Sequence, residues 1–240
     1  MSALSDFIRK AHHSFCSVIV VAAGNATRMG KDKLFLPLGG EPILARTLMA
    51  LDQCQAVDEL IVVTREEKLE QIGALKDQYG LKKLTKIVFG GETRTESALA
   101  GVSEADKRAK IICIHDGVRP FVTNELVEDV VHYAVLYQAA APAIPVKDTI
   151  KRARAGVVTD TPDRSELFAV QTPQAFQADL IKAALSSAVA KQQSFTDDCA
   201  AVEALGVKAY LSRGSEDNIK ITTPADLYLA EAIWNNRGMT

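Results

Sequence analysis

Short apolar runs that alternate with amphipathic helical patterns are the feature that most restricts the fold of this chain. The runs are rich in β-branched residues without polar alternation, which is typical of strands buried on both faces of a sheet. We expect strands at 17–22, 59–64, 86–89, 110–115 and 140–145. Apolar residues three and four positions apart predict helices at 42–53, 66–79, 93–103 and 124–137. This order predicts an α/β fold, Rossmann-like, with a mostly parallel sheet and helices on both faces.

The alternation stops after residue 145, where the segment 146–166 is polar and charged, with Gly156 and Pro162 as turn residues. We expect a projecting β-hairpin arm. The arm is either an exposed charged hairpin or, since an arm with little core of its own is best stabilised against another subunit, a dimerisation element of a homodimer with arm exchange. The pattern then returns, with strands at 167–171 and 208–211 and helices at 178–190, at 198–205 and from residue 224.

Length and composition favour one α/β domain at 17–240, preceded by an N-terminal extension of residues 1–16. The formal net charge is −2, which argues against binding of nucleic acid or of a membrane surface through bulk charge. No stretch approaches the apolar length of a membrane span. The four cysteines lack C-x-x-C spacing, so we expect buried thiols and a cytoplasmic protein.

The first predicted strand leads directly into a loop of small residues that also carries Arg28, Lys31 and Lys33. Small side chains let backbone N–H groups approach phosphate oxygens, and cations offset the charge of a leaving pyrophosphate. Five residues separate Gly24 from Gly30, and no hydroxyl follows Lys31, so the loop is not a P-loop. The dinucleotide fingerprint also fails, because it lacks its second glycine. We expect a polyphosphate loop in which Lys31 competes with Lys33 for one role.

Other polar clusters follow predicted strands, where ligands bind in parallel sheets. Gly91 and Ser97 lie in a glycine-rich turn that opens a helix, and they suit either a pyrimidine pocket or a plain turn with a helix cap. Asp116 and Arg119 follow a buried strand; they either pair with each other or serve a nucleotide, with the carboxylate as a magnesium or ribose ligand. His115 is expected to be a packed histidine rather than a base.

Taken in order, these clusters resemble the family of 2-C-methyl-D-erythritol 4-phosphate cytidylyltransferases, enzymes of the non-mevalonate isoprenoid pathway. The clusters are Ala22-Ala23-Gly24 with Arg28-Met29 and Lys33, Gly90-Gly91 with Arg94 and Ser97, Asp116 with Arg119-Pro120, Asp148-Thr149, Asp163-Arg164, Gln171-Thr172-Pro173-Gln174, Thr196-Asp197, and Asn218-Ile219-Lys220. The resemblance implies attack of the sugar-alcohol phosphate on the α-phosphorus of CTP, with release of pyrophosphate. It also implies Mg²⁺ on the triphosphate, with Asp116 as a candidate ligand.

The resemblance assigns roles to individual residues. It implies a catalytic set of Arg28, Lys33, Arg164 and Lys220. It implies nucleotide contacts from Ala22, Ala23, Gly24, Gly91, Glu92, Ser97, Asp116 and Gly117. It implies a sugar-phosphate pocket of Asp116, Arg119, Thr149, Arg164, Thr172, Thr196 and Lys220. The arm that carries Thr149 and Arg164 is expected to reach the partner's site. A phosphate monoester is largely dianionic at neutral pH, so no strong general base is needed.

Two positions depart from the family pattern, and three competing functions stay open. Ala26 stands where the family usually has glycine, and Asp198 where glutamate often follows Thr-Asp. A ribitol 5-phosphate cytidylyltransferase shares fold, nucleotide and chemistry, although Ala22-Ala23-Gly24 favours methylerythritol. A nicotinamide-dependent oxidoreductase is disfavoured by the broken fingerprint. A non-catalytic nucleotide-binding regulator is the third.

Overall fold

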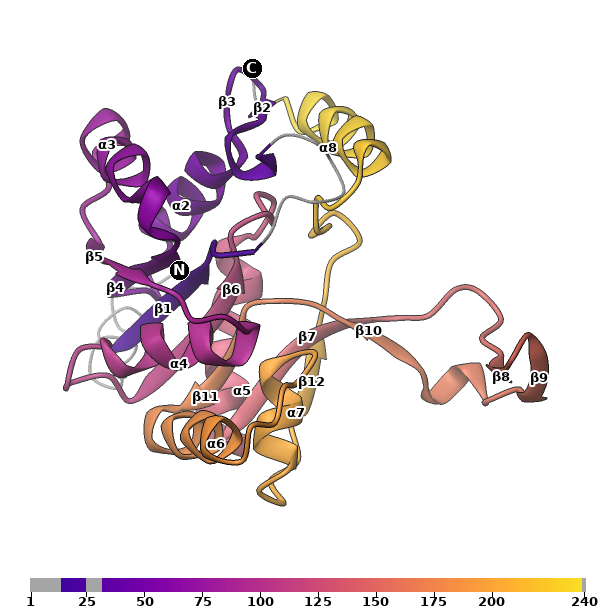
Figure 1. Ribbon diagram of the computed structural model, residues 1–240. Coiled ribbons are helices and arrows are strands. Elements are labelled where there is room, and N and C mark those ends of the chain that lie inside the picture. The colour runs from indigo at the N-terminus through magenta and orange to yellow at the C-terminus, as the bar shows by residue number, and fades with distance from the viewer. Residues whose placement is uncertain (1–13, 25–31, 239–240) are drawn as a thin grey trace, which may run out of the picture.

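The computed structural model describes residues 14–24 and 32–238 and is organised around one mixed sheet (Figure 1). The strand order is β10-β7-β11-β6-β1-β4-β5, with β12 paired to β7. The parallel half has β1 (Cys16–Val21) between β4 (Glu59–Thr64) and β6 (Ile111–Asp116), and β5 (Leu84–Phe89) beyond β4. This half confirms the mainly parallel α/β fold expected from the β-branched runs.

The other half of the sheet is built on β7 (Ala139–Pro145). Strand β12 (Tyr210–Arg213) runs parallel to it, whereas β10 (Phe168–Val170) and β11 (Gln174–Gln177) run antiparallel to it. The strand predicted at 167–171 is present as β10, whereas the strand at 174–177 was not predicted. Strands β10 and β11 both pair with β7 and are separated by residues 171–173. Strand β11 is too short and too polar to show a strand pattern in the sequence.

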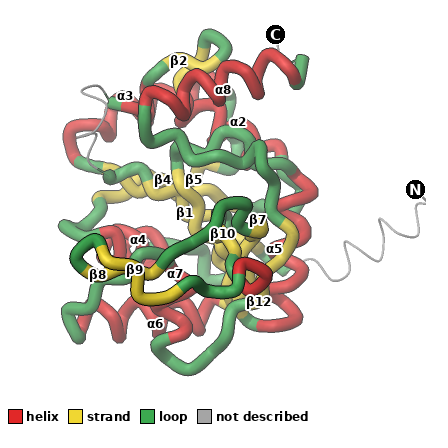
Figure 2. Tube along the Cα trace, turned by 90° about the vertical axis from the view of Figure 1, so that its right-hand side faces the viewer, coloured by secondary structure: helices red, strands yellow, loops and turns green. Residues whose placement is uncertain are grey.

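Helices cover both faces of the sheet (Figure 2). One face packs against α2 (Ile43–Gln53), α3 (Leu69–Tyr79), α5 (Asn124–Tyr137) and α8 (Pro224–Asn236). The opposite face packs against α4 (Arg94–Ser103), α6 (Ala178–Ala190) and α7 (Asp198–Glu203). Strand β1 serves both cores, because Val18 and Val20 face the first and Ile19 the second. This two-sided burial explains why the strand lacks polar alternation.

The segment between β7 and β10 extends away from the sheet (Figure 1). It contains the antiparallel pair β8 (Arg152–Arg154) and β9 (Val157–Asp160), followed by the short helix η3 (Arg164–Glu166). Every residue of β8 and β9 is exposed. The hairpin expected from the polar segment after residue 145 is therefore present and projects from the body.

Three short elements near the first loop were not predicted. They are η1 (Lys33–Phe35) and the two-residue strands β2 (Pro37–Leu38) and β3 (Glu41–Pro42), which form a small hairpin. A further short helix, η2 (Glu66–Lys68), precedes α3. Over the ranges 14–24 and 32–238, no helix has both the length and the apolar character needed to cross a membrane.

Candidate active site

A pocket of about 170 Å³ opens at the carboxyl ends of β1 and β6. Its lining residues are Val21, Ala22, Gly24, Lys33, Leu34, Arg94, Asp116, Val118 and Lys220. Five of them, Ala22, Gly24, Lys33, Asp116 and Lys220, belong to the site predicted from the sequence. The pocket lies where parallel sheets bind ligands, because the loops that follow neighbouring strands meet at that edge.

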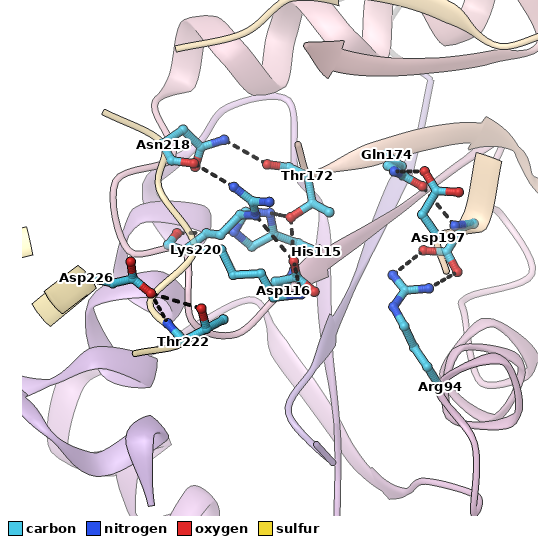
Figure 3. A network of polar contacts seen from close by, with 12 residues as sticks. Arg94, His115, Asp116, Thr172, Gln174, Asp197, Asn218, Lys220, Thr222 and Asp226 are labelled. Carbon is cyan, nitrogen blue, oxygen red and sulfur yellow. Dashed lines mark hydrogen bonds and ion pairs between the residues drawn. The ribbon is translucent and has the colours of Figure 1, made fainter. Parts of the chain in front are cut away.

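Asp116, which lines the pocket, pairs with two cations, Lys220 and Arg119, and Figure 3 shows Lys220 beside it. Its Oδ2 lies 3.0 Å from Lys220 Nζ and 3.3 Å from Arg119 Nε. Burial by itself would raise the pKa of this carboxyl group, but Lys220 and Arg119 hold the pKa at about 2. Asp116 is therefore ionised at neutral pH, and the pairing with Arg119 that the sequence left open is present.

His115 lies behind Asp116 and is fully buried. Its Nε2 is 3.3 Å from the Arg119 carbonyl oxygen and its Nδ1 is 3.1 Å from Thr172 Oγ1. Burial lowers the pKa of His115 to about 4, so the ring is neutral at pH 7. The carbonyl can only accept, which assigns the ring proton to Nε2, and the Thr172 hydroxyl then donates to Nδ1. The prediction of a packed histidine is confirmed.

Thr172 and Asn218 connect the end of β6 to the segment that carries Lys220 (Figure 3). The backbone N–H of Asp116 donates to Thr172 Oγ1 at 3.1 Å, and Asn218 Nδ2 donates to the Thr172 carbonyl at 2.9 Å. Arg119 Nη1 donates to the Asn218 carbonyl at 2.7 Å. These bonds hold the segment that carries Lys220 against the end of β6, so the Lys220 side chain is delivered to the pocket by a buried network.

Arg94 also lines the pocket, although the sequence places it only in a motif and assigns it no role. It is the first residue of α4, and its guanidinium forms two hydrogen bonds with the Asp198 carboxylate, at 2.8 and 2.6 Å. Its place in the cluster from Gly90 to Ser97, directly after a strand, was the available signal. The acidic partner comes from a segment far along the chain, and the sequence alone does not show that contact.

Gly91, Glu92 and Ser97, which are predicted to contact the nucleotide, are not among the residues that line the pocket. Ser97 is buried, and its Oγ donates to the Gly91 carbonyl at 3.3 Å. Glu92 is exposed. Thr93 caps α4 in a capping box with Glu96, so the expected helix cap is present, and the pyrimidine pocket at this segment stays a prediction. A Cβ at Gly90 would lie 2.6 Å from Ser97 Oγ and 2.9 Å from Ala23 Cβ, so this glycine lets the two loops approach closely.

Two further residues with a predicted nucleotide role, Ala23 and Gly117, lie just after the strand ends. The Ala23 carbonyl accepts from Arg65 Nε at 3.0 Å. The Gly117 N–H donates to the Val21 carbonyl at 3.1 Å, and its carbonyl accepts from Thr47 Oγ1 at 3.0 Å. The loops after β1 and β6 are thereby joined to each other and to α2.

Three further predicted residues, Thr149, Arg164 and Thr196, are also absent from the lining of the pocket. Thr149 and Arg164 lie on the exposed segment between β7 and β10, where Arg164 Nη1 donates to the Lys147 carbonyl at 2.7 Å. Thr196 is exposed just before α7. Arg28 and Lys31 lie outside the described residues, so their predicted roles are not placed.

Comparison with known proteins agrees with this geometry. The profile of the family 2-C-methyl-D-erythritol 4-phosphate cytidylyltransferase matches residues 16–236. The chain is 45% identical over 219 residues to the protein of that name from Halalkalibacterium halodurans, covering 90% of this chain and 96% of that protein. It is likewise 45% identical over 220 residues to the protein of that name from Caldanaerobacter subterraneus, covering 90% and 96%.

Solved structures show the same likeness in three dimensions. The crystal structure of 4-diphosphocytidyl-2C-methyl-D-erythritol synthase from Anaerococcus prevotii superposes with a TM-score of 0.84 at 31% identity, covering 93% of this chain and 97% of that one. The 2-C-methyl-D-erythritol 4-phosphate cytidylyltransferase of Thermus thermophilus gives a TM-score of 0.75 at 32% identity, with 92% and 99% covered. With the pocket at the carboxyl ends of its parallel strands, this chain belongs to the 2-C-methyl-D-erythritol 4-phosphate cytidylyltransferase family.

Proposed function

We propose that this protein transfers the cytidylyl group of CTP to 2-C-methyl-D-erythritol 4-phosphate, in the non-mevalonate isoprenoid pathway. The products are 4-CDP-2-C-methyl-D-erythritol and pyrophosphate. The observation that carries the proposal is the meeting of Lys33 and Lys220, from opposite ends of the chain, in one pocket beside Asp116. Membership of the cytidylyltransferase family supports the same reaction.

The chemistry needs positioning and charge more than proton transfer. A phosphate oxygen of the sugar alcohol forms a new bond to the α-phosphorus of CTP, while the bond to the bridging oxygen breaks and its electron pair leaves with pyrophosphate. The attacking phosphate monoester is largely dianionic at neutral pH and requires no base. This agrees with the neutral, buried state of His115, which offers no base to the pocket.

Two anionic reactants repel each other, so the cations of the site have to offset their charge. Lys33 is proposed to stabilise the charge that develops at the α-phosphate and the leaving group, with Arg28 in the same role. Lys220 is proposed to hold the attacking phosphate in line. In the described structure Lys220 pairs with Asp116. Asp116 thus keeps the ammonium aimed at the pocket before the substrate phosphate competes for it.

We propose Mg²⁺ as the cofactor. The described residues contain no group of three or more His, Cys, Asp or Glu side chains that could hold a metal ion by themselves. Magnesium on a triphosphate needs only one or two protein carboxylates, and Asp116 supplies one carboxylate in the pocket, so the residues present fit. The ion, when bound, supplies neutralisation of the triphosphate charge.

We propose that the protein is a homodimer in which each arm completes the site of the other subunit. Two observations support this. Arg164 and Thr149 are exposed and away from the pocket of their own chain, and the apolar Val157 and Val158 at the arm tip are 68% and 54% exposed. An isolated two-stranded hairpin is marginally stable, so a partner is expected to cover it. The four cysteines are free, which supports a cytoplasmic location.

A pyrophosphate-release assay with CTP and Mg²⁺ tests the function. We expect turnover with 2-C-methyl-D-erythritol 4-phosphate and none with ribitol 5-phosphate; turnover with ribitol 5-phosphate alone would reverse the substrate assignment. Calorimetry tests for an oxidoreductase and for a regulator. Binding of NADH without binding of CTP would favour an oxidoreductase, and binding of CTP without turnover of either sugar phosphate would favour a regulator.

A further inference from the structure

Arg94 presents unused hydrogen-bond donors to the pocket. The guanidinium has five N–H donors, two of which bind Asp198, so three are left, and the described residues offer these no other acceptor. The Arg94 side chain is 26% exposed, and it lines the same pocket as Ala22 and Asp116. A cation with free donors in an anion-binding pocket is in a position to contact the substrate directly.

Asp198, at the start of α7, fixes the orientation of the Arg94 guanidinium. Asp198 is only 1% exposed, and each of its oxygens accepts from a different guanidinium nitrogen, Oδ1 at 2.8 Å and Oδ2 at 2.6 Å. This two-point contact fixes the plane of the guanidinium as well as its position. A buried ion pair is costly to desolvate and is weak evidence for a stabilising role, so its clearer effect is to direct the remaining donors.

Gln174 in turn fixes Asp198. Its Oε1 accepts from the backbone N–H groups of Asp198 and Cys199, both at 3.0 Å, and its Nε2 donates to Asp197 Oδ2 at 2.9 Å (Figure 3). Asp197 caps α7 through the N–H of Ala200 at 3.0 Å. The first turn of α7 is therefore anchored to β11 through one buried amide side chain, and the Asp198 carboxylate has one direction in which to point.

The segment whose Gln174 holds Asp198, the partner of Arg94, also holds Asp116. Thr172, two residues before Gln174, accepts from the Asp116 backbone N–H. The short segment 172–174 thus positions both the carboxylate at the end of β6 and the guanidinium at the start of α4. This positioning role accounts for the polar residues at 172, 174, 197 and 198. The resemblance implies a substrate contact for Thr172, and the reaction assigns no direct role to the other three.

We propose that Arg94 is a further substrate-binding residue that donates to oxygen atoms of the bound nucleotide, and that Asp198, held by Gln174, is the positioning residue for it. The proposal rests on the proposed function. Arg94 belongs to the nucleotide side of the pocket because it follows the Gly90-Gly91 turn, which packs closely on Ala23. A lysine at this position would keep the charge but could not pair at two points and still present directed donors.

Steady-state kinetics of Arg94→Lys and Asp198→Asn tests this inference. We expect Arg94→Lys to raise the KM for CTP about tenfold or more, as for a lost hydrogen bond to a charged group, with less than about a twofold change in the KM for the sugar phosphate. Asp198→Asn should act in the same direction. Asp198→Glu keeps a carboxylate and is expected to retain a KM for CTP within about threefold of the parent.

The matched control is Asp106→Asn, which removes the carboxylate of the bidentate Arg108–Asp106 pair in the loop before β6, at the opposite end of that strand from the pocket. It should leave both KM values unchanged. Calorimetric titration of CTP in the absence of sugar phosphate gives a second readout, in which Arg94→Lys should weaken binding by the same factor. If Asp198→Asn does not fold, Arg94→Lys decides alone.

An unchanged KM and Kd for CTP in Arg94→Lys would overturn the inference. So would an equal loss for both substrates accompanied by a lower unfolding temperature, because that pattern indicates a structural role only. Failure of the proposed function is distinguishable, since the parent protein would then not turn over 2-C-methyl-D-erythritol 4-phosphate at all.

Discussion

The Lys220 ammonium lies 3.0 Å from the Asp116 carboxylate, although the two residues come from segments far apart in the chain. The Lys220 side chain is 41% exposed, whereas that of Asp116 is 10% exposed, so solvent and ligands reach the pair from the lysine side. An incoming phosphate can therefore replace the carboxylate as the partner of Lys220 without disturbing the buried contacts of Asp116 with Arg119.

Lys220→Met tests this exchange. We expect kcat to fall by about a hundredfold or more, because a preorganised charge at the attacking phosphate is lost. Pyrophosphate release measures the effect. The control is Lys86→Met, which breaks the exposed Lys86–Glu104 pair, at 2.9 Å, outside the pocket. Equal activity of the two variants would contradict the proposed role of Lys220.

Lys33→Ala should lower turnover by about two to three orders of magnitude while the protein stays folded, since the side chain lies on a short helix at the wall of the pocket. The exposed Lys107→Ala serves as the control, and we expect it to retain parental rates. Lys31 is predicted to share or take over the role of Lys33, so the double variant Lys31→Ala/Lys33→Ala should be less active than Lys33→Ala if the two lysines share it.

Arm exchange predicts complementation between two inactive variants. Co-expressed Arg164→Ala and Lys220→Ala chains form heterodimers in which one of the two sites has all its residues, if Arg164 acts across the dimer. Random pairing then gives about a quarter of the parental activity. Each variant alone should be close to inactive. If the mixture is no more active than its components, Arg164 acts within its own chain or not at all.

Stability should fall on mild acidification because of His115. Burial lowers its pKa to about 4 from an ordinary value of 6.5, so the unfolded chain binds a proton that the folded protein excludes in this interval. The folded state loses about 2 kcal/mol between pH 7 and pH 5 from this one group. Urea unfolding at both pH values measures the loss. His115→Gln should reduce it, whereas the exposed His132→Gln should not.

Gly90→Ala should raise the KM for CTP, because the added Cβ would meet Ser97 Oγ at 2.6 Å and Ala23 Cβ at 2.9 Å. The two loops would then have to separate. Gly73→Ala in α3 is the matched control, since its Cβ would meet only Ile87 Cδ1 at 4.0 Å, and alanine is the better helix former. We expect Gly73→Ala to be neutral or to stabilise the protein slightly. Unaltered kinetics in Gly90→Ala would show that the close approach is not required.

Local patterns were enough to identify most of the architecture. The β-branched runs located β1, β4 and β6, because a strand buried on both faces has to be apolar at every position. The motifs at the ends of those strands also located Lys33 and Asp116, since residues at the carboxyl ends of parallel strands share one edge, whereas Lys220 was predicted only from the resemblance of its motif to the family. These inferences depend only on residues close together in the chain.

Long-range contacts decided the rest. The division into β10 and β11 is defined by how each pairs with β7. Strand β11 is too short for its residues to show a periodic pattern. The role of Gln174 as an anchor for Asp198, and of Asp198 as the partner of Arg94, depends on side chains that meet only after the sheet and α7 have packed. A residue's neighbours in sequence determine which element it joins, whereas its hydrogen-bond partners are chosen by packing between elements, which no local pattern encodes.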